Sequence, residues 1–299
     1  MEATLQVYAF AWGAVWGSFL NVVIHRLPAG ASLVHPPSAC ATCGTRIRWY
    51  DNVPIVSYLV LRGRCRACGA GYSPRYMLVE LACGLLSLAL FRSLALPLED
   101  IDALTDAAWM WLWLQAFVYA MVALAFIDLE HLYLPDEITI GGLFIALAGA
   151  HFIPVERPAD HTIGMLAGAA FLGAVWAIGW LVYRREALGL GDVKLLALIG
   201  AWLGWRALPF VLIAAAVQAL AAVLIARVYT RVTGKPAGFT MTTAELDAFF
   251  GETDRYDPAL ASHTAIPFGP FLTLGAIEAL FFGADALWIL ADRLGALLG

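Results

Sequence analysis

The sequence contains few charged residues. Asp, Glu, Lys and Arg make up 14% of its 299 residues, whereas hydrophobic residues make up 62%. The mean hydropathy of +0.78 lies far outside the range of soluble globular domains. The shortage of charge therefore predicts an all-α polytopic membrane protein surrounded by membrane lipid. No basic tract with interleaved aromatic residues is present, so we expect no nucleic-acid partner.

Several familiar catalytic and targeting motifs are also missing. The sequence contains no Gly-x-Ser-x-Gly and no His-Glu-x-x-His, which excludes the usual serine-hydrolase and zinc-protease signatures. Its six histidines are scattered, and only His131 stands beside an acidic segment. Glu2 is the only charge ahead of His25, so we expect no cleaved signal peptide.

Long apolar runs predict about eight transmembrane helices, because a spanning helix needs about 20 mostly apolar residues. The runs are Leu5–Ile24, Met77–Leu96, Ala107–Ile127, Ile138–Ile153, Ile163–Val182, Leu195–Trp205, Ala207–Val228 and Phe268–Leu290. The sixth run is short. It is either a half-span or part of the seventh helix, with a break near Arg206 and Pro209.

The distribution of basic residues predicts the orientation in the membrane. If the loop from His25 to Arg75 is cytoplasmic, fourteen of the 18 Lys and Arg residues fall on the cytoplasmic side. This bias fits the positive-inside rule and puts both termini outside. A polar stretch at about residues 230–265 then forms a cytoplasmic insertion, with a short helix expected at Thr243–Phe250.

Four of the five cysteines form two Cys-x-x-Cys pairs, Cys40/Cys43 and Cys65/Cys68. Two such pairs in one loop are typical of a tetrahedral zinc site with four thiolate ligands. Four thiolates leave no open coordination position, so we expect the zinc to be structural rather than catalytic. A redox pair is the alternative, which the presence of both pairs in one loop disfavours. Cys83, inside an apolar run, is expected to be a packing residue.

Two carboxylates lie at the ends of apolar runs. Asp128 closes the third run, and Asp192, framed by Gly189 and Gly191, opens the sixth. A carboxylate at the edge of a membrane helix is costly and indicates function, although Asp192 can also be read as a simple helix cap. If both face one site, they share a proton and can activate a water, as in aspartic proteases.

The neighbouring polar residues have alternative interpretations. Metal binding by Asp128, Glu130, His131 and Asp192 is conceivable, but the spacing does not require it. Glu130 and His131 are more simply read as a solvated helix end. Lys194 either tunes the two carboxylates or extends to the membrane surface.

Ordered motifs along nearly the whole chain resemble the Gly-x-Gly-Asp aspartyl proteases of the membrane, and among them the type IV prepilin leader peptidases. They are Gly17–Pro28, the paired cysteines, Ser57–Leu59, Arg62–Cys65, Arg75–Glu80, the two aspartate segments and Ile266–Pro270. So many motifs in the same order make a chance similarity very unlikely.

The resemblance implies a bacterial inner-membrane enzyme that cleaves the leader of type IV prepilins, or of pseudopilins of type II secretion, at the cytoplasmic face. Bifunctional members then N-methylate the new N-terminal residue with S-adenosylmethionine. By motif, Asp128 and Asp192 are the catalytic pair, and the four cysteines hold zinc. Gly63 and Glu80 fall in motifs linked to methylation and are the candidate cofactor-binding residues.

The resemblance also implies a division of the chain. Residues 1–27 form the first transmembrane helix, residues 28–76 a cytoplasmic tetracysteine zinc loop associated with methylation, and residues 77–299 a polytopic membrane peptidase domain. Met77 and Ala41 replace family prolines, which affects the methylation assignment more than proteolysis. The alternatives are a peptidase without methyltransferase activity, a metal-dependent membrane hydrolase, and a non-enzymatic transporter or scaffold with a structural zinc loop.

Overall fold

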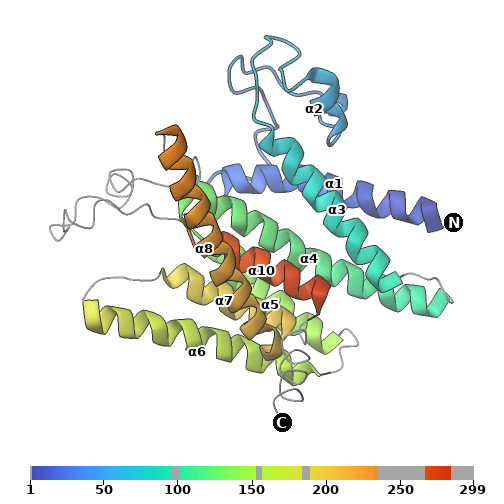
Figure 1. Cartoon of the computed structure of the whole chain (residues 1–299). Coiled ribbons are helices and arrows are strands. Elements are labelled where there is room, and N and C mark those ends of the chain that lie inside the picture. The colour runs from blue at the N-terminus through green and yellow to red at the C-terminus, as the bar shows by residue number, and fades with distance from the viewer. Residues whose placement is uncertain (1, 96–100, 153–156, 184–188, 235–266, 284–299) are drawn as a thin grey trace.

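The computed structural model of the chain describes residues 2–95, 101–152, 157–183, 189–234 and 267–283 (Figure 1). The helices are α1 (Glu2–Arg26), α2 (Val56–Leu61), α3 (Arg75–Ala95), α4 (Ile101–His131), α5 (Asp136–Phe152), α6 (Pro158–Tyr183), α7 (Leu190–Leu203), α8 (Leu208–Thr233) and α10 (Gly269–Phe282). The predicted all-α fold is confirmed for these residues. The helix expected at Thr243–Phe250 lies outside them.

Five of the helices are long and apolar enough to cross a membrane, within the residues that the structure describes: α1, α3, α4, α6 and α8. The prediction of about eight spans is therefore not confirmed. The remaining three predicted runs form α5, α7 and α10, which have 17, 14 and 14 residues. At 1.5 Å per residue, helices of 14 residues reach only about 21 Å, less than the apolar thickness of a bilayer.

Helices α1, α3 and α4 form one side of the molecule (Figure 1). Small residues let α1 and α3 approach closely. A Cβ on Gly13 would lie 2.4 Å from the backbone oxygen of Cys83, and one on Gly17 would lie 2.7 Å from the Cα of Glu80. Such small residues four apart are a common contact between membrane helices, because they let the backbones meet.

Helices α5, α6, α7, α8 and α10 form the other side, and α10 packs against α4, α7 and α8 (Figure 1). Gly164 of α6 and Gly200 of α7 touch through their backbones, since a Cβ on either would lie 2.2 Å from the other's oxygen. The sixth predicted run is a separate helix. Helix α7 stops at Gly204, whose φ is +78°, and a short 3-10 turn, Trp205–Ala207, leads into α8.

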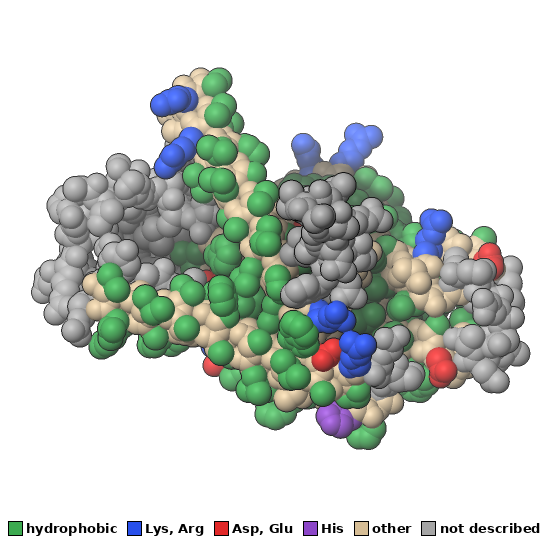
Figure 2. Space-filling view, turned by 60° about the horizontal axis from the view of Figure 1, so that its bottom comes forward, with side chains coloured by type: hydrophobic (Ala, Val, Ile, Leu, Met, Phe, Trp, Pro, Cys, Tyr) green, Lys and Arg blue, Asp and Glu red, His purple; other side chains and the backbone are tan. Residues whose placement is uncertain are grey.

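Apolar side chains cover much of the outer surface. In the view of Figure 2, hydrophobic side chains dominate the described surface, and basic side chains are few and sit in small groups. Many large hydrophobic side chains of α6 and α8 are exposed. An exposed apolar band on long helices is what contact with lipid requires. Helix α8 also continues to Thr233, four residues into the stretch expected to be a polar insertion.

The segment between α1 and α3 is built differently. It contains only the short helix α2, a 3-10 turn at Trp49–Asp51 and two isolated β-bridges. Only Ser57 and Gly63 are buried within residues 27–74. This segment, which we call the cysteine region, projects from the helices beside the start of α3 (Figure 1).

Candidate functional site

The two predicted carboxylates come together in the structure. Asp128 lies in the last turn of α4 and is 7% exposed. Asp192 lies in the first turn of α7 and is partly buried. Their carboxylates, 64 positions apart in the sequence, are close enough to interact electrostatically. Two acids in one partly buried site at helix ends form an arrangement that can share a proton.

A tight connection between α4 and α5 brings the two acids together. Helix α4 ends at His131, and the next residue, Leu132, adopts a left-handed conformation with φ of +48°. The chain then places the buried side chain of Leu134 against Gly191, where an added Cβ would lie 3.1 Å from Leu134 Cδ1. Because Gly191 has no side chain, Leu134 can pack directly on the first turn of α7, one residue before Asp192.

Helix α10 supplies a third component of the site. The backbone N–H of Gly269 is a hydrogen-bond donor to the Asp128 carboxylate. A Cβ on Gly269 would lie 2.4 Å from Asp128 Oδ2, so only glycine fits here without a shift. Gly269 belongs to the motif Ile266–Pro270, which the sequence offered only as a resemblance, and the structure brings this residue of the motif to the acid.

The interpretation of Asp192 as a helix cap receives no support. The N-cap residue of α7 is Gly189, and no side chain forms a capping hydrogen bond there. The two glycines around Asp192 also differ in their surroundings. Leu134 fills the space beside Gly191, whereas a Cβ on Gly189 would meet no atom closer than 3.9 Å. Of the two, only exposed Gly189 leaves room for an approaching chain.

Two ion pairs border the acids. Lys194 of α7 pairs with Asp136 at the start of α5, and Arg75 at the start of α3 pairs with Glu130. Lys194 and Glu130 thus join neighbouring helices, and Glu130 is also exposed, as expected for a solvated helix end. Within the described parts of the chain, the four loop cysteines are the one cluster of three or more potential metal ligands. The alternative of a metal held by Asp128, Glu130, His131 and Asp192 therefore lacks support.

The four loop cysteines converge as predicted. The Sγ atoms of Cys40 and Cys68 are 3.8 Å apart, those of Cys43 and Cys65 are 4.0 Å apart, and all four lie within 4.8 Å of one another. A tetrahedral zinc ion with Zn–S bonds of about 2.3 Å requires sulfur atoms about 3.8 Å apart. The residues present therefore fit a tetrathiolate zinc ion, and all four thiols are free.

The two cysteine pairs have the same backbone structure. In each pair, the N–H of the first cysteine donates a hydrogen bond to the carbonyl of the residue five positions later. This residue is Thr45 in one pair and Ala70 in the other. The glycine after each second cysteine donates back to the first cysteine's carbonyl. Both glycines, Gly44 and Gly69, have positive φ, of +69° and +74°. The second turn repeats the first 25 positions later, as the bridges Ala39–Arg46 and Arg64–Gly71 also show.

The first turn favours thiolates. Hydrogen bonding to Thr45, whose hydroxyl lies 3.3 Å from Cys43 Sγ, lowers the pKa of Cys43 to about 6. Backbone amides of Cys43 and then Thr42 lower the pKa of Cys40. Because a metal binds the thiolate rather than the thiol, these contacts prepare the pair for a cation.

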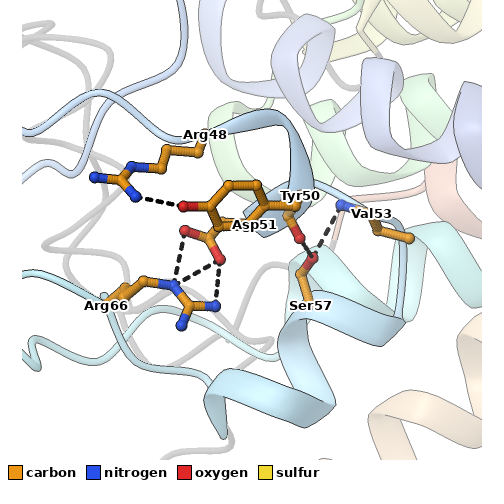
Figure 3. Close-up of polar contacts among 6 residues, drawn as sticks. All are labelled: Arg48, Tyr50, Asp51, Val53, Ser57 and Arg66. Carbon is orange, nitrogen blue, oxygen red and sulfur yellow. Dashed lines mark hydrogen bonds and ion pairs between the residues drawn. The ribbon is translucent and has the colours of Figure 1, made fainter.

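A polar network joins the cysteine turns to α2 (Figure 3). Arg66, between the second pair of cysteines, donates from Nε and Nη2 to the Asp51 carboxylate at 2.6–3.0 Å. Its guanidinium also lies over the Tyr50 ring, 5.7 Å from the centroid. Ser57 of α2 donates to the Tyr50 carbonyl at 3.1 Å and accepts from the Val53 N–H at 2.9 Å.

Gly63 and Glu80 connect the cysteine region to the helices. Gly63 is buried with φ of +64°, and an added Cβ would lie 2.9 Å from the Tyr58 ring. Glu80 Oε2 accepts a hydrogen bond of 2.7 Å from the N–H of Ile55, immediately before α2, and the Ser18 hydroxyl is a further partner. Each residue is therefore already engaged by the protein itself.

Sequence reasoning missed three contributors: Leu134, Gly269 and Ile55. For Gly269 the signal was present, because its motif was recognised but given no role. Leu134 and Ile55 are ordinary apolar residues in loops. Their importance comes from contacts with Gly191 and Glu80 that only the folded chain creates.

Comparisons with known proteins identify a family and several relatives. A family model described as the bacterial Peptidase A24 N-terminal domain matches residues 11–94, and one described as the type IV leader peptidase family matches residues 115–225. A prepilin leader peptidase/N-methyltransferase of Myxococcus xanthus is 35% identical over 98% of this chain and 95% of its own length. Relatives of the same name in Burkholderia pseudomallei and Pseudomonas putida are 35% and 34% identical, over 92% and 91% of this chain and 85% and 89% of their own. No solved structure matches.

Proposed function

This chain belongs to the type IV leader peptidase family, and on that premise we propose that it cleaves the leader of type IV prepilins or pseudopilins and then methylates the new N-terminal amine. The observation that carries the proposal is the meeting of Asp128 and Asp192, which come from different helices and interact in one partly buried site. The peptidase needs two carboxylates, and this site provides them.

The surroundings of the two acids suggest how they divide the work. The Gly269 N–H bonds to the Asp128 carboxylate and orients it, and we assign Asp128 the role of the base. Asp128 then takes a proton from the attacking water, while protonated Asp192 donates to the scissile carbonyl oxygen. The resulting tetrahedral intermediate collapses when the leaving amine accepts the proton that Asp128 took from water and a hydroxyl of the intermediate returns a proton to Asp192.

The position of the site suggests which side of the membrane the substrate approaches from. The chain is a multi-pass membrane protein. We place it in the bacterial inner membrane with the two acids and the cysteine region on the cytoplasmic side. Support comes from two basic side chains at helix ends: Arg26 ends α1, and Arg75, which begins α3, pairs with Glu130 two residues beyond Asp128.

Methylation is assigned to the cysteine region. S-adenosylmethionine supplies the methyl group, and Cys40, Cys43, Cys65 and Cys68 would hold a structural zinc ion that keeps the region folded. Gly63 and Glu80 contact Tyr58 and Ile55 within the protein. We therefore propose that they position the methylating region, and their own contacts favour this role over direct binding of the methyl donor.

The proposed division of the chain follows from these roles. Residues 1–27 form the first membrane helix, residues 28–76 the methylation-associated zinc loop and residues 77–299 the peptidase domain. Asp128, Asp192 and Gly269 all lie in the last part. A peptidase without methyltransferase activity remains the minor alternative, and the name of the relatives disfavours it.

Purified protein in detergent, incubated with a prepilin peptide and S-adenosylmethionine, tests the proposal. Mass spectrometry of the product is expected to show loss of the leader and a gain of one methyl group at the new N-terminus. Cleavage is expected to continue with a chelator in the assay, because the two acids require no metal.

Two results would contradict the proposal. Absence of cleavage by a folded preparation would favour a transporter or scaffold. Cleavage that stops on chelation and returns with added metal would favour a metal-dependent hydrolase.

A further inference from the structure

Helix α2 of the cysteine region has its apolar face turned outward. Val56, Leu59 and Val60 are 54%, 62% and 68% exposed. Residues three and four positions apart lie on one face of a helix, so these side chains form a single stripe. On the opposite face Ser57 is only 8% exposed. A short helix in water would be expected to have the reverse arrangement.

The inward position of Ser57 is held by specific contacts. Its hydroxyl bonds to the Tyr50 carbonyl and the Val53 N–H (Figure 3). The adjoining Trp49 is 83% exposed. Because Ser57 is fixed on the inner side, α2 cannot rotate to bury its stripe without breaking both hydrogen bonds.

Helix α2 is attached to α3 close to the start of α3. The hydrogen bond from Ile55 N–H to Glu80 holds the start of α2 beside α3. Glu80 lies five residues beyond Arg75, where α3 begins, which is about 7.5 Å along the helix. With the start of the apolar helix α3 taken as the membrane surface, this distance matches the boundary between headgroups and acyl chains, where the apolar face of an interfacial helix inserts.

Basic and aromatic side chains flank the stripe. Arg62 follows α2 directly, Arg64 is two residues further on, and both are exposed. Neither forms an ion pair in the described residues. The Tyr72 ring packs edge to face against the rings of Tyr58 and Tyr76. Arginine near lipid phosphate and aromatic rings at the interface are typical of membrane-surface contact.

We propose that α2 and Trp49 form an interfacial anchor that seats the cysteine region on the lipid surface. The stripe of Val56, Leu59 and Val60 contacts acyl chains, and Arg62 and Arg64 contact lipid phosphates. The zinc turns are thereby held next to the membrane, beside the start of α3 and the Arg75–Glu130 ion pair. This contact between the cysteine region and lipid does not depend on the proposed peptidase and methyltransferase activities.

Photo-crosslinking in the full-length protein tests the anchor. The amino acid p-benzoylphenylalanine is placed at Val60, and the protein is reconstituted in vesicles of phosphatidylethanolamine and phosphatidylglycerol. Leu85, an exposed side chain in the middle of α3, serves as the positive control. Ala67, an exposed residue at the tip of the second cysteine turn, serves as the reference outside the stripe. Lipid adducts are measured by mass spectrometry.

The expected result is a lipid adduct at Val60 that approaches the yield at Leu85 and exceeds the yield at Ala67 several-fold. A yield at Val60 no higher than at Ala67 would overturn the proposal. So would an adduct with protein, whether a second copy or a prepilin added to the vesicles, in place of lipid. The crosslinker replaces an exposed side chain, and an unchanged melting temperature confirms that each variant is folded.

A second arm tests the role of the arginines. The variant carrying Arg62→Gln and Arg64→Gln is expected to lower the adduct yield at Val60 in vesicles with phosphatidylglycerol. In vesicles of phosphatidylcholine alone, where no net negative charge is present, the two proteins are expected to give equal yields. Equal yields in both kinds of vesicle would contradict the assignment of Arg62 and Arg64 to lipid phosphates.

Discussion

The cysteine region and the helices around the aspartates position their functional groups by different means. Asp128 and Asp192 are held by α4, α7 and α10, whose inward side chains are largely buried. The cysteine region has almost no buried side chains and depends on backbone turns, on the network around Arg66 and on the four thiols. Apolar packing stabilises the first site, whereas the second has few buried side chains and carries four thiols that could hold a stabilising metal ion.

Because the two sites are stabilised in different ways, we expect that each can lose its function while the other keeps its own. Loss of metal is expected to unfold the cysteine region while the helices stay packed. Loss of a catalytic carboxylate is expected to stop peptide hydrolysis while the cysteine turns stay intact. The Ile55–Glu80 hydrogen bond joins the cysteine region to α3, and the Arg75–Glu130 ion pair joins α3 to α4.

The largest effect is expected at the two carboxylates. Asp128→Asn and Asp192→Asn each remove a group that must gain or lose a proton. Leader cleavage should therefore fall by about a thousandfold or more, because a positioned acid or base contributes about 10² to 10⁴ in rate. Initial rates with a prepilin peptide measure the loss. Asp136→Asn changes a nearby carboxylate that pairs with Lys194 and is the matched control. Its rate of leader cleavage should stay within a few-fold of the rate of the original protein.

A variant at Asp128 or Asp192 that still cleaves at the original rate would remove that residue from the catalytic pair. Circular dichroism and a melting curve in detergent establish that each Asn variant is folded. Asn nearly matches Asp in shape, so the expected change in fold is small.

The next largest effect is expected on the metal. Cys43→Ser removes one of four ligands, so bound zinc, measured by elemental analysis, should fall well below one ion per chain. Methylation of a pre-cleaved peptide should drop by about tenfold or more, in line with the loss that a disturbed metal site causes. Leader cleavage should change by no more than about twofold, because the acids are held by other helices.

Cys83→Ala is the matched control, since Cys83 is buried in α3 away from the other four cysteines. It should keep both zinc and methylation. Full methylation by a Cys43→Ser protein that has lost its zinc would break the link between the metal and the second activity.

A more moderate effect is expected at Gly269. Gly269→Ala places a Cβ 2.4 Å from Asp128 Oδ2, so the carboxylate or α10 must shift. A displacement of about 1 Å in a catalytic group costs about a hundredfold in rate, and leader cleavage should fall by that order while methylation of a cleaved peptide is kept. Gly141→Ala is the control, because a Cβ there meets no atom within 4 Å. Equal cleavage by both variants would show that the close contact at Asp128 has no catalytic importance.

The smallest effect is expected at the ion pair of Arg75 and Glu130. Both side chains are partly exposed, 18% and 35%, and such pairs contribute about 1 kcal/mol or less. Glu130→Gln should lower the melting temperature by a few degrees at most. The charge-reversed protein, Arg75→Glu with Glu130→Arg, should recover part of that loss. If the charge-reversed protein melts at a lower temperature than Glu130→Gln, the direction of the two charges would matter more than their attraction.

The parts of the molecule that the sequence predicted are those set by local pattern. The Cys-x-x-Cys pairs and their glycines specified the cluster of four thiols, because each turn is closed by its own backbone hydrogen bonds. Apolar runs specified the long helices, and the break after Leu203 matched a suspected interruption. Asp128 and Asp192 stood out because carboxylates are rare in such runs.

Other features depend on contacts between distant segments and had no local signal. The packing of Leu134 on Gly191 and of Gly269 on Asp128 arises only when α4, α7 and α10 meet. Hydropathy also could not give the number of spans, because α5 and α7 are short helices that the surrounding bundle supports. The outward face of α2 went unnoticed since a six-residue helix is too short to show a period.

The most direct test of separate sites is a mass-spectrometric measurement on one set of proteins. The Asp128→Asn protein and a zinc-stripped original are each given an uncleaved prepilin peptide, a pre-cleaved peptide and S-adenosylmethionine. The expected result is a crossed pattern: the Asp128→Asn protein methylates the pre-cleaved peptide but removes no leader, and the zinc-stripped protein removes the leader but adds no methyl group. Loss of both activities in each protein would contradict the account, because it would mean that one site performs both reactions.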